Sequence, residues 1–298
     1  MVRERFLVVV ADDYGIGPET SRGILELALE GRVTATVLLV NTPHAEEAVA
    51  AWERAGRPFE VGWHPNLTLD RPLLPPERVP SLVDRDGRFW TLGRFLRRVC
   101  TGRIRGAEVV AEFRAQFGRF SDLVGRPPLM INSHQHVAIF PPVGGALLGL
   151  LAEQAPRPYL RRVRESAATL ARVPGAKLKR AVLHCLGRRL ARRSARLGLP
   201  GCDTLIGVTD PPYVADEQFY ARWLEYAPGS YVELACHPGY RDETLIGRDC
   251  TDDDAYVARR VHELHLLRSA DFPEAVRRFG FRLAAPAELR GGRKARAA

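Results

Sequence analysis

The chain has no long apolar segment and no cysteine framework. No stretch approaches the roughly 20 apolar residues that a membrane-spanning helix needs, so we do not expect an integral membrane protein. The five cysteines are widely spaced and include no C-x-x-C pair, which argues against a disulfide framework and against a cysteine zinc site. The sequence also contains no phosphate-binding glycine loop, no G-x-S-x-G motif and no internal repeat.

The N-terminus is not typical of a signal peptide. Arg3 and Arg5 precede the apolar run from Phe6 to Ala11, but this run is too short and ends in two acids instead of a small-residue cleavage site. We therefore expect a cytoplasmic protein. Its 298 residues, 46% of them hydrophobic and 27% charged, are ordinary for a globular protein and allow one barrel or two smaller domains.

Strands and helices are predicted to alternate along the chain. The valine-rich run that ends at Ala11 indicates a buried parallel strand, and residues 19–31 form an amphipathic pattern that stops at Gly31. Such alternation predicts an α/β fold with parallel strands and crossover helices. Further strands are expected at 34–40, 59–63, 129–132, 160–163, 231–236 and 280–283, and further helices at 44–55, 106–124, 142–154, 216–226 and 252–269. The proline-rich segment 65–90 predicts a long loop over the strand ends.

The net charge of +9 is concentrated in two segments. Eight basic residues and no acidic one lie between Ala176 and Leu197, and the tail from Arg290 onward adds four more. These twelve exceed the net charge, so a uniformly basic surface is not implied. Leucines at helical spacing predict that residues 176–197 form a surface helix with one solvated face. Contact with anionic lipid is the alternative, and nucleic acid is disfavoured because aromatic residues are absent from this stretch.

Polar side chains follow the ends of several predicted strands. They are Asp12 and Asp13, His64, His134 and His136, Arg164 and Glu165, and His237. Because the carboxyl ends of parallel strands meet at one end of a sheet or barrel, we expect these side chains to converge there. For the two aspartates, capping of the next helix is the ordinary alternative.

The residue types point to metal-dependent hydrolysis. Two imidazoles and one carboxylate form a common catalytic metal site with open positions for water and substrate. A metal held in this way lowers the pKa of bound water to about 7 and polarises a carbonyl. One aspartate could bind the metal while its neighbour acts as base, and His237 could be the acid. The spacing does not decide between Asp12 and Asp13.

Four ordered motifs resemble one known family. VVVADDYGIG, VGWHPNLTL, INSHQHV and ELACHPGY are similar to the motifs of the YdjC-like carbohydrate deacetylases, the family of the chitooligosaccharide deacetylases. The resemblance implies a distorted, TIM-like (β/α) barrel. We expect a single domain over residues 1–289, with a basic helical insertion at about 167–200 and a basic disordered tail at 290–298. The resemblance further implies hydrolysis of an N-acetyl group from an acetylated amino sugar with one divalent metal ion, Mg²⁺ or Zn²⁺.

The resemblance also implies roles for six side chains. The metal ligands would be Asp13, His64 and His134. Asp12 would be the general base, His237 the general acid, and Arg164 the residue that orients the base.

The chain departs from the family pattern on both sides of His134. Asn132 stands where an aspartate is common, and Ala138 replaces a further histidine. His136 therefore stays an alternative to His134 as a metal ligand.

Other functions and partners stay open at this point. One alternative is another metal-dependent amide or phosphoester hydrolase, although a phosphoesterase should show a second metal and more basic residues at strand ends. Another is a non-catalytic protein that binds an anionic surface. Some members of the family resemble deacetylases of sugar-bearing hopanoid lipids, so peripheral membrane contact through residues 176–197 would suit a lipid-linked substrate. A homodimer is compatible with the sequence, which does not determine the oligomeric state.

Overall fold

The computed structural model describes residues 4–251 and 255–292. At its centre lies a parallel sheet with the order β5–β4–β3–β2–β1–β7–β6, and β8 pairs with β1. The strands are β1 (Arg5–Tyr14), β2 (Ala35–Leu38), β3 (Glu60–Trp63), β4 (Met130–Ile131), β5 (Tyr159–Leu160), β6 (Thr204–Ile206), β7 (Tyr231–Cys236) and β8 (Phe281–Leu283).

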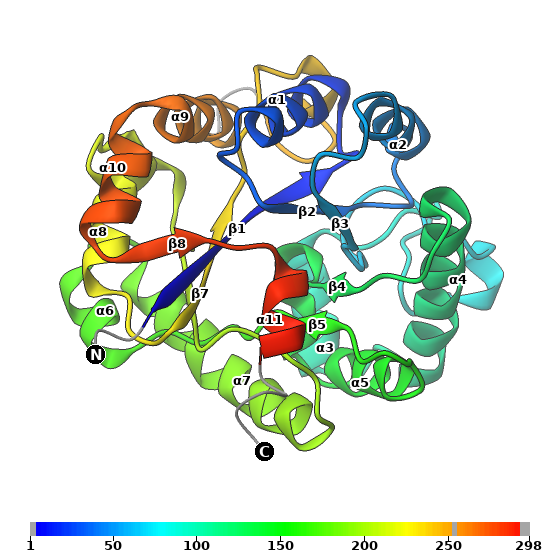
Figure 1. The fold of residues 1–298 in the computed structure, drawn as a ribbon. Coiled ribbons are helices and arrows are strands. Elements are labelled where there is room, and N and C mark those ends of the chain that lie inside the picture. The colour runs from blue at the N-terminus through cyan, green and yellow to red at the C-terminus, as the bar shows by residue number, and fades with distance from the viewer. Residues whose placement is uncertain (1–3, 252–254, 293–298) are drawn as a thin grey trace.

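Helices surround the strands, as Figure 1 shows. The α-helices are α1 (Pro18–Leu29), α2 (Ala45–Arg54), α3 (Leu92–Cys100), α4 (Gly106–Val124), α5 (Val143–Ala152), α6 (Ala167–Arg172), α7 (Lys177–Arg196), α8 (Phe219–Tyr226), α9 (Tyr256–Arg268), α10 (Asp271–Arg278) and α11 (Pro286–Gly292). Short 3-10 turns are η1 (Pro76–Arg78), η2 (His134–Ile139), η3 (Pro211–Ala215) and η4 (Glu243–Leu245).

The sheet curls toward a barrel. The two end strands of the sheet, β5 and β6, lie close to each other. Leu205 N of β6 donates a hydrogen bond to Arg164 O, just after β5, at 2.7 Å. Leu160 N of β5 likewise donates to Pro200 O, just before β6, at 2.9 Å. The prediction of a single-domain, distorted, TIM-like (β/α) barrel is therefore confirmed.

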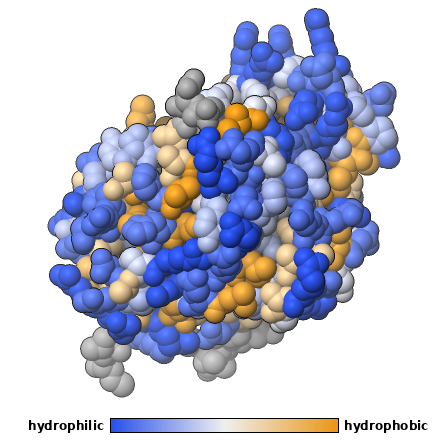
Figure 2. All heavy atoms as spheres, turned by 90° about the horizontal axis from the view of Figure 1, so that it is seen from above, coloured by the Kyte–Doolittle hydropathy of each residue, from blue (hydrophilic) through white to orange (hydrophobic). Residues whose placement is uncertain are grey.

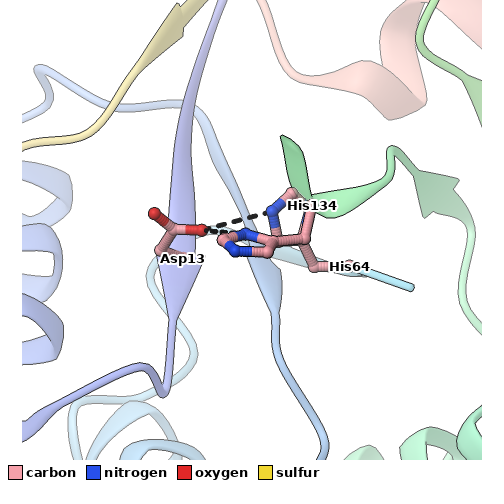
Figure 3. A group of neighbouring side chains, drawn as sticks. All are labelled: Asp13, His64 and His134. Carbon is pink, nitrogen blue, oxygen red and sulfur yellow. Dashed lines mark hydrogen bonds and ion pairs between the residues drawn. The ribbon is translucent and has the colours of Figure 1, made fainter. Parts of the chain in front are cut away.

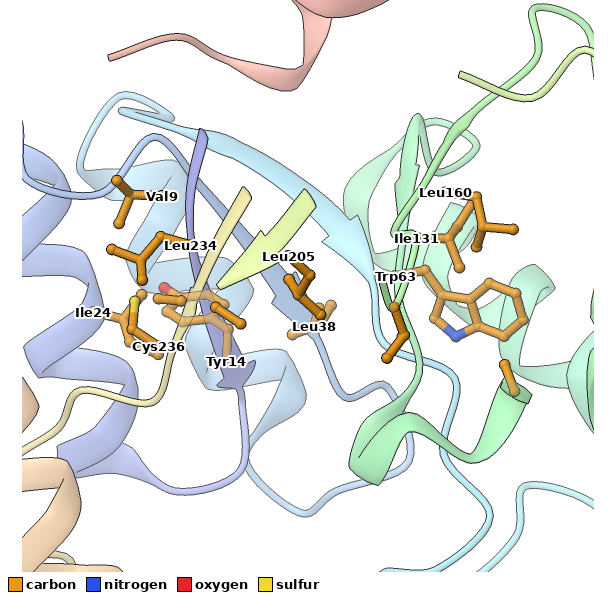
Figure 4. Close-up of a cluster of buried hydrophobic side chains, with 14 of the residues drawn as sticks. Val9, Tyr14, Ile24, Leu38, Trp63, Ile131, Leu160, Leu205, Leu234 and Cys236 are labelled. Atoms are coloured by element: carbon orange, nitrogen blue, oxygen red, sulfur yellow. The ribbon is translucent and has the colours of Figure 1, made fainter. Parts of the chain in front are cut away.

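Side chains of β1 alternate between the barrel interior and the helical layer. Leu7 and Val9 belong to the large core between strands and helices, part of which Figure 4 shows. Val8 and Val10 belong to a separate interior cluster, which Leu289 of α11 joins. This alternation decides which residues at the strand ends face the interior.

Several elements were not expected from the sequence. α3, β6 and α10 lie in stretches without a predicted element, and each is nine residues or shorter. α6 lies within the helical insertion expected at about 167–200. α11 continues to Gly292, so the helix overlaps the tail expected to start at residue 290. The rest of that tail, residues 293–298, and the start of the helix expected from Asp252 lie outside the described residues.

The proline-rich segment 65–90 is anchored to α4 by a buried polar stripe. Glu108, Glu112 and Gln116 are spaced four residues apart and all are buried. Glu108 accepts a hydrogen bond from Ser81 N at 2.7 Å, and Glu112 accepts from Leu73 N at 2.9 Å. We call this stripe and the backbone that it holds the loop seam.

The basic stretch 176–197 is a helix, as predicted. In α7, Leu190 and Ala191 are buried against the barrel, whereas Leu178 is 81% and Val182 is 46% exposed. Among the described residues no helix is long and apolar enough to cross a bilayer. The face seen from above Figure 1 is mostly hydrophilic with scattered hydrophobic side chains (Figure 2), which is ordinary for a protein surface.

Candidate active site

The C-terminal end of β1 directs two neighbouring carboxylates into one site. Val10 and Asp12 share the side of β1 that faces the barrel interior, so regular alternation would turn Asp13 toward the helices. The pairing of β1 with β2 shifts its register between Ala11 and Tyr14, and Asp13 has φ 70°. Aspartate tolerates this left-handed conformation better than most residues. The bulge therefore brings both carboxylates to the same end of the barrel.

Neither aspartate caps the following helix. α1 begins after Gly17, and its first-turn amides, Glu19 N and Thr20 N, donate to Asp242 Oδ2 at 3.0 and 3.1 Å. Asp242 lies in the segment after β7. The capping alternative for Asp12 and Asp13 is therefore wrong.

Asp13, His64 and His134 lie together at this end of the barrel (Figure 3). His64 Nε2 is 3.3 Å and His134 Nδ1 is 2.9 Å from Asp13 Oδ1. His64 Nδ1 lies 3.2 Å from the carbonyl oxygen of Asn132. Because a carbonyl can only accept, Nδ1 of a neutral His64 carries the proton and its Nε2 presents a lone pair to Asp13. Two facing acceptors repel each other unless a cation or a proton lies between them.

This donor set fits a divalent cation. His134 Nε2 is buried and has no hydrogen-bond partner among the described residues, and the His64–Asn132 contact is the kind of outer contact that orients metal-binding imidazoles. Ion pairs connect the site to further charges, which we call the mouth cluster. It consists of the carboxylates of Asp12, Asp13, Glu233, Asp249 and Glu263 and the guanidiniums of Arg161, Arg259 and Arg260. With neutral imidazoles its net charge is −2, which one divalent cation would balance.

Arginines keep the two aspartates ionised. Burial alone would raise the pKa of Asp12, but Arg161 lowers it well below its ordinary value. Burial likewise opposes ionisation of Asp13, and Arg260 holds the pKa of that carboxyl well below its usual range. Arg260 Nη2 donates to Asp13 Oδ2 at 2.8 Å, which leaves Oδ1 facing the two histidines.

Asp12 is fixed from two sides. Arg161 donates to both of its carboxylate oxygens, with Nη2 2.8 Å from Oδ1. Asn132 Nδ2 donates to Oδ1 at 3.0 Å. An aspartate at position 132, which the resemblance led us to expect, would instead place a second acceptor beside Asp12, so Asn132 spares the site one like-charge contact.

Arg161 is in turn held by a carboxylate inside the barrel. Its Nε donates to Glu233 Oε1, and Tyr159 OH donates to Glu233 Oε2 at 2.6 Å. Tyr159, Arg161 and Glu233 are all buried. One guanidinium therefore connects the candidate base Asp12 to an interior carboxylate that the sequence interpretation did not include.

His237 lies on the solvent side of the site. Its side chain is 28% exposed, whereas that of Asp12 is 3% exposed, and its Nε2 lies 3.9 Å from Asp12 Oδ2. Its backbone N donates to Glu263 Oε2 at 2.6 Å, and Arg259 Nη2 donates to its Nδ1 at 3.2 Å. Burial, followed by the charge of Arg259, lowers the pKa of His237 well below the ordinary value of a histidine.

One expectation from the strand ends needs correction, and one alternative is disfavoured. The arginine that contacts Asp12 is Arg161 and not Arg164, whose side chain is exposed. The residues grouped as metal donors include His134 and not His136. Burial and the nearby Arg161 lower the pKa of His136 to about 3, so this imidazole stays neutral beside the mouth cluster.

Glu165, the partner of Arg164 at the predicted strand end, also lies away from the site. Glu165 pairs with Arg180 of α7, and its backbone N donates to His184 Nδ1 at 3.1 Å. Ala138, at the position where the resemblance led us to expect a histidine, is buried and donates its backbone N–H to Ser133 Oγ at 3.0 Å. Both residues support the backbone around the site and do not reach Asp13.

Known proteins resemble this chain over nearly its full length. A "carbohydrate deacetylase" from mouse is 32% identical over 275 residues, which cover 88% of this chain and 87% of the relative. A "chitooligosaccharide deacetylase" from Klebsiella pneumoniae is 31% identical over 286 residues, covering 94% and 97%. A crystal structure from Enterococcus faecalis, of a protein named for a proposed role in cellobiose-phosphate cleavage, matches with a TM-score of 0.73 and 26% identity, covering 96% of this chain and 99% of that one.

The family assignment rests on the same residues that build the barrel and its site. A sequence model described as "YdjC-like protein" matches residues 6–278, from the first apolar residue of β1 to the end of α10. This range contains both aspartates of the site, the two histidines beside them and His237. The chain therefore belongs to the YdjC-like protein family.

Proposed function

We propose that this protein is a metal-dependent N-deacetylase that removes the acetyl group from an N-acetylated amino sugar. The observation that carries the proposal is the approach of His64 Nε2 and Asp13 Oδ1, two facing acceptors 3.3 Å apart. The relatives named as carbohydrate deacetylases support the substrate class. Among the described residues only one group of metal-donor side chains is found, which argues against a phosphoesterase with two metals.

Asp13, His64 and His134 would hold the cation through one oxygen and two nitrogens. This donor set suits Zn²⁺ better than Mg²⁺, which prefers oxygen ligands. When bound, such a cation lowers the pKa of water to about 7 and polarises a carbonyl. Arg260 occupies the second oxygen of Asp13 and so favours coordination through the first.

Asp12 and His237 would move the protons. Asp12 would accept the proton of the attacking water, and its contacts with Arg161 and Asn132 fix the direction of its carboxylate. His237 would donate a proton to the departing amine from the solvent side of the site. Its side chain is partly exposed, whereas the other members of the site are nearly fully buried. His237 is therefore the member that a substrate would reach first.

The direct test is release of acetate from N-acetylglucosamine oligomers and glycoconjugates by metal-loaded protein. We expect release by the wild type and by His265→Gln, because His265 is exposed on α9, and loss of release in His134→Gln. The absence of acetate across this panel from protein with a full complement of metal would contradict the proposal.

We further propose that α7 allows the enzyme to act on a substrate at an anionic lipid surface. Leu178 and Val182 are exposed near its N-terminal end. The C-terminal half of the helix adds an exposed basic group that consists of Arg188, Arg189, Arg192, Arg193 and Arg196. None of these five forms an ion pair with another described residue, and a basic helix with exposed apolar side chains is typical of interfacial binding.

This part is tested by sedimentation with liposomes that contain anionic lipid. Replacing Arg188, Arg189, Arg192 and Arg193 by glutamine should abolish association and should leave activity on soluble sugar unchanged. Equal association of the wild type and the variant with these liposomes would contradict the proposal and would indicate that α7 is only a solvated surface helix.

A further inference from the structure

His237 and Arg259 meet in an unusual way for a candidate acid. Arg259 Nη2 lies 3.2 Å from His237 Nδ1. A guanidinium has only donors, so Nδ1 must accept this hydrogen bond with its lone pair. The proton of the neutral imidazole must then reside on Nε2, the nitrogen that lies 3.9 Å from Asp12 Oδ2.

The guanidinium of Arg259 is held in place independently of His237. Its Nε donates to Glu263 Oε1 at 2.7 Å, four residues later on α9, and its Nη1 donates to Thr209 O at 3.1 Å. Arg259 and Glu263 are both buried. Only Nη2 is left to face the imidazole, and this fixed orientation excludes a carboxylate from the Nδ1 side.

Glu263 fixes the histidine as well. Its Oε2 accepts the backbone N of His237 at 2.6 Å and the hydroxyl of Tyr220 at 3.3 Å. One carboxylate on α9 therefore sets both the end of β7 and the guanidinium that touches the imidazole. This shared partner couples the position of His237 to the position of Arg259.

We propose that Arg259 is a positioning residue that holds His237 as the neutral tautomer with its proton on Nε2. In the ordinary arrangement of a catalytic histidine, a carboxylate at Nδ1 favours the cationic form. Here the guanidinium of Arg259 takes that place. A neutral imidazole that donates from a fixed nitrogen, with its pKa lowered by its surroundings, is a known electrophile in enzymes.

The charges around His237 agree with this assignment. Asp12 and Asp13 of β1 favour the cationic imidazole, whereas Arg259 and Arg260 of α9 oppose it. Glu263 is engaged by Arg259, Tyr220 and the His237 backbone. Burial and the arginines prevail, and they lower the pKa of His237.

The catalytic meaning of this tautomer rests on the proposed deacetylation. Water adds its oxygen to the acetamide carbon while its proton passes to Asp12. The C–N bond then breaks, and the nitrogen takes the proton of His237 Nε2 as it leaves with the bonding pair. Arg259 stabilises the negative charge that develops on the imidazole. The proton on Asp12 then returns to Nε2, and the 3.9 Å between Asp12 Oδ2 and Nε2 must shorten to hydrogen-bond distance for this transfer. Amine and acetic acid leave, and both groups are restored.

The first test observes the imidazole directly. Protein labelled with ¹⁵N in its histidine rings is examined by NMR with the metal bound, and His237→Gln identifies the signal. We expect Nε2 protonated and Nδ1 unprotonated at pH 7. A doubly protonated ring, or a proton on Nδ1 alone, in the wild type would overturn the proposal.

The second test removes the guanidinium. Arg259→Met should raise the pKa of His237 by at least about one unit, because the carboxylates of Asp12 and Asp13 would no longer be opposed at Nδ1. It should lower kcat about 10- to 100-fold with KM within about twofold. Arg259→Lys should restore part of kcat, since an ammonium also only donates. Arg268→Gln changes an arginine of the same helix whose half-buried partner is Glu26 of α1, and this variant should behave as the wild type.

These readouts separate the inference from the proposed function. The NMR result in the wild type does not require turnover or the stability of any variant. An Nε2–H ring in protein that releases no acetate would leave the tautomer established and the deacetylase proposal contradicted. An unchanged kcat in a folded Arg259→Met variant of an active enzyme would overturn the positioning role.

Discussion

Carboxylates are buried in two regions of this molecule in opposite ways. In the mouth cluster, Asp12 and Asp13 face arginines, and their pKa values fall well below the ordinary range. In the loop seam, Glu112 faces the backbone amides of Leu73 and Leu74 and the side-chain amide of Gln116. Burial raises the pKa of Glu112 despite these donors.

The difference separates a chemical role from a structural one. Guanidiniums keep a buried carboxylate charged and leave it able to bind a cation or accept a proton. Neutral amides satisfy the oxygens of Glu112 but do not compensate its charge fully. The mouth cluster thus keeps its carboxylates ionised, whereas the carboxylates of the loop seam bind backbone amides of the segment 65–90.

Removing the candidate metal ligand Asp13 should produce the largest effect. Asp13→Asn leaves two histidines and a neutral amide, so we expect loss of bound metal and a fall in activity of about 10³-fold or more, since such a cation lowers the barrier by several kcal/mol. Metal content by mass spectrometry and acetate release measure both effects. Asp122→Asn, on the exposed side of α4, is the control. Full metal content in Asp13→Asn would contradict the ligand assignment.

Replacing the candidate base Asp12 should lower activity without removing the metal. Asp12→Asn should retain the metal, because Asp13, His64 and His134 are unchanged. Its activity should fall about 10²- to 10⁴-fold, the usual contribution of a general base. Loss of metal together with activity would instead indicate that the two aspartates have exchanged roles.

The interior support of Arg161 should matter less. Glu233→Gln leaves Arg161 paired with Asp12 alone, and we expect kcat to fall about 10-fold with unchanged metal content and KM. Tyr159→Phe removes only the hydroxyl that donates to Glu233 and should have a smaller effect in the same direction. If Glu233→Gln changes stability but not kcat, the interior carboxylate has a structural role only.

The sequence pattern was sufficient for the α/β class and for the residues that directly follow most apolar strands, whereas the barrel came from the family resemblance and β6 was not predicted. Apolar runs that alternate with helical patterns indicated parallel strands. The residues that follow these runs included Asp12, His64 and His237. Within β1, the interior positions Val8 and Val10 lead in steps of two to Asp12. This regularity requires no tertiary information.

Other parts of the site depend on contacts that local patterns do not contain. The strand expected at 160–163 pairs only over Tyr159–Leu160. It therefore ends earlier than expected, and Arg161, not Arg164, directly follows it. The steps of two from Tyr159 would have identified Arg161, had the start of the strand been known. Arg259 and Arg260 lie within a predicted helix, and only packing of α9 against the barrel mouth brings them to His237 and Asp13.

The smallest effect on activity is expected in the loop seam, where a substitution should change the free energy of unfolding instead. Because the pKa of Glu112 is raised in the folded protein, the native state binds more protons than the unfolded chain above about pH 4.5, the ordinary value. The free energy of unfolding contributed by Glu112 is therefore full at lower pH and declines as the pH rises through the folded pKa. Glu112→Gln has no such titration and loses one acceptor, at a cost of about 1–3 kcal/mol.

Denaturant unfolding of both proteins at a series of pH values measures this difference. The advantage of the wild type over Glu112→Gln should shrink as the pH rises from about 4.5, while activity at saturating metal stays close to that of the wild type. The carboxylates of the mouth cluster have the opposite sign, since a lowered pKa stabilises the folded state at higher pH. These contributions are common to both proteins and cancel in the comparison. An advantage that grows with pH would mean that the amides of the loop seam stabilise the charge of Glu112 as arginines do for Asp12, and the contrast between the two regions would disappear.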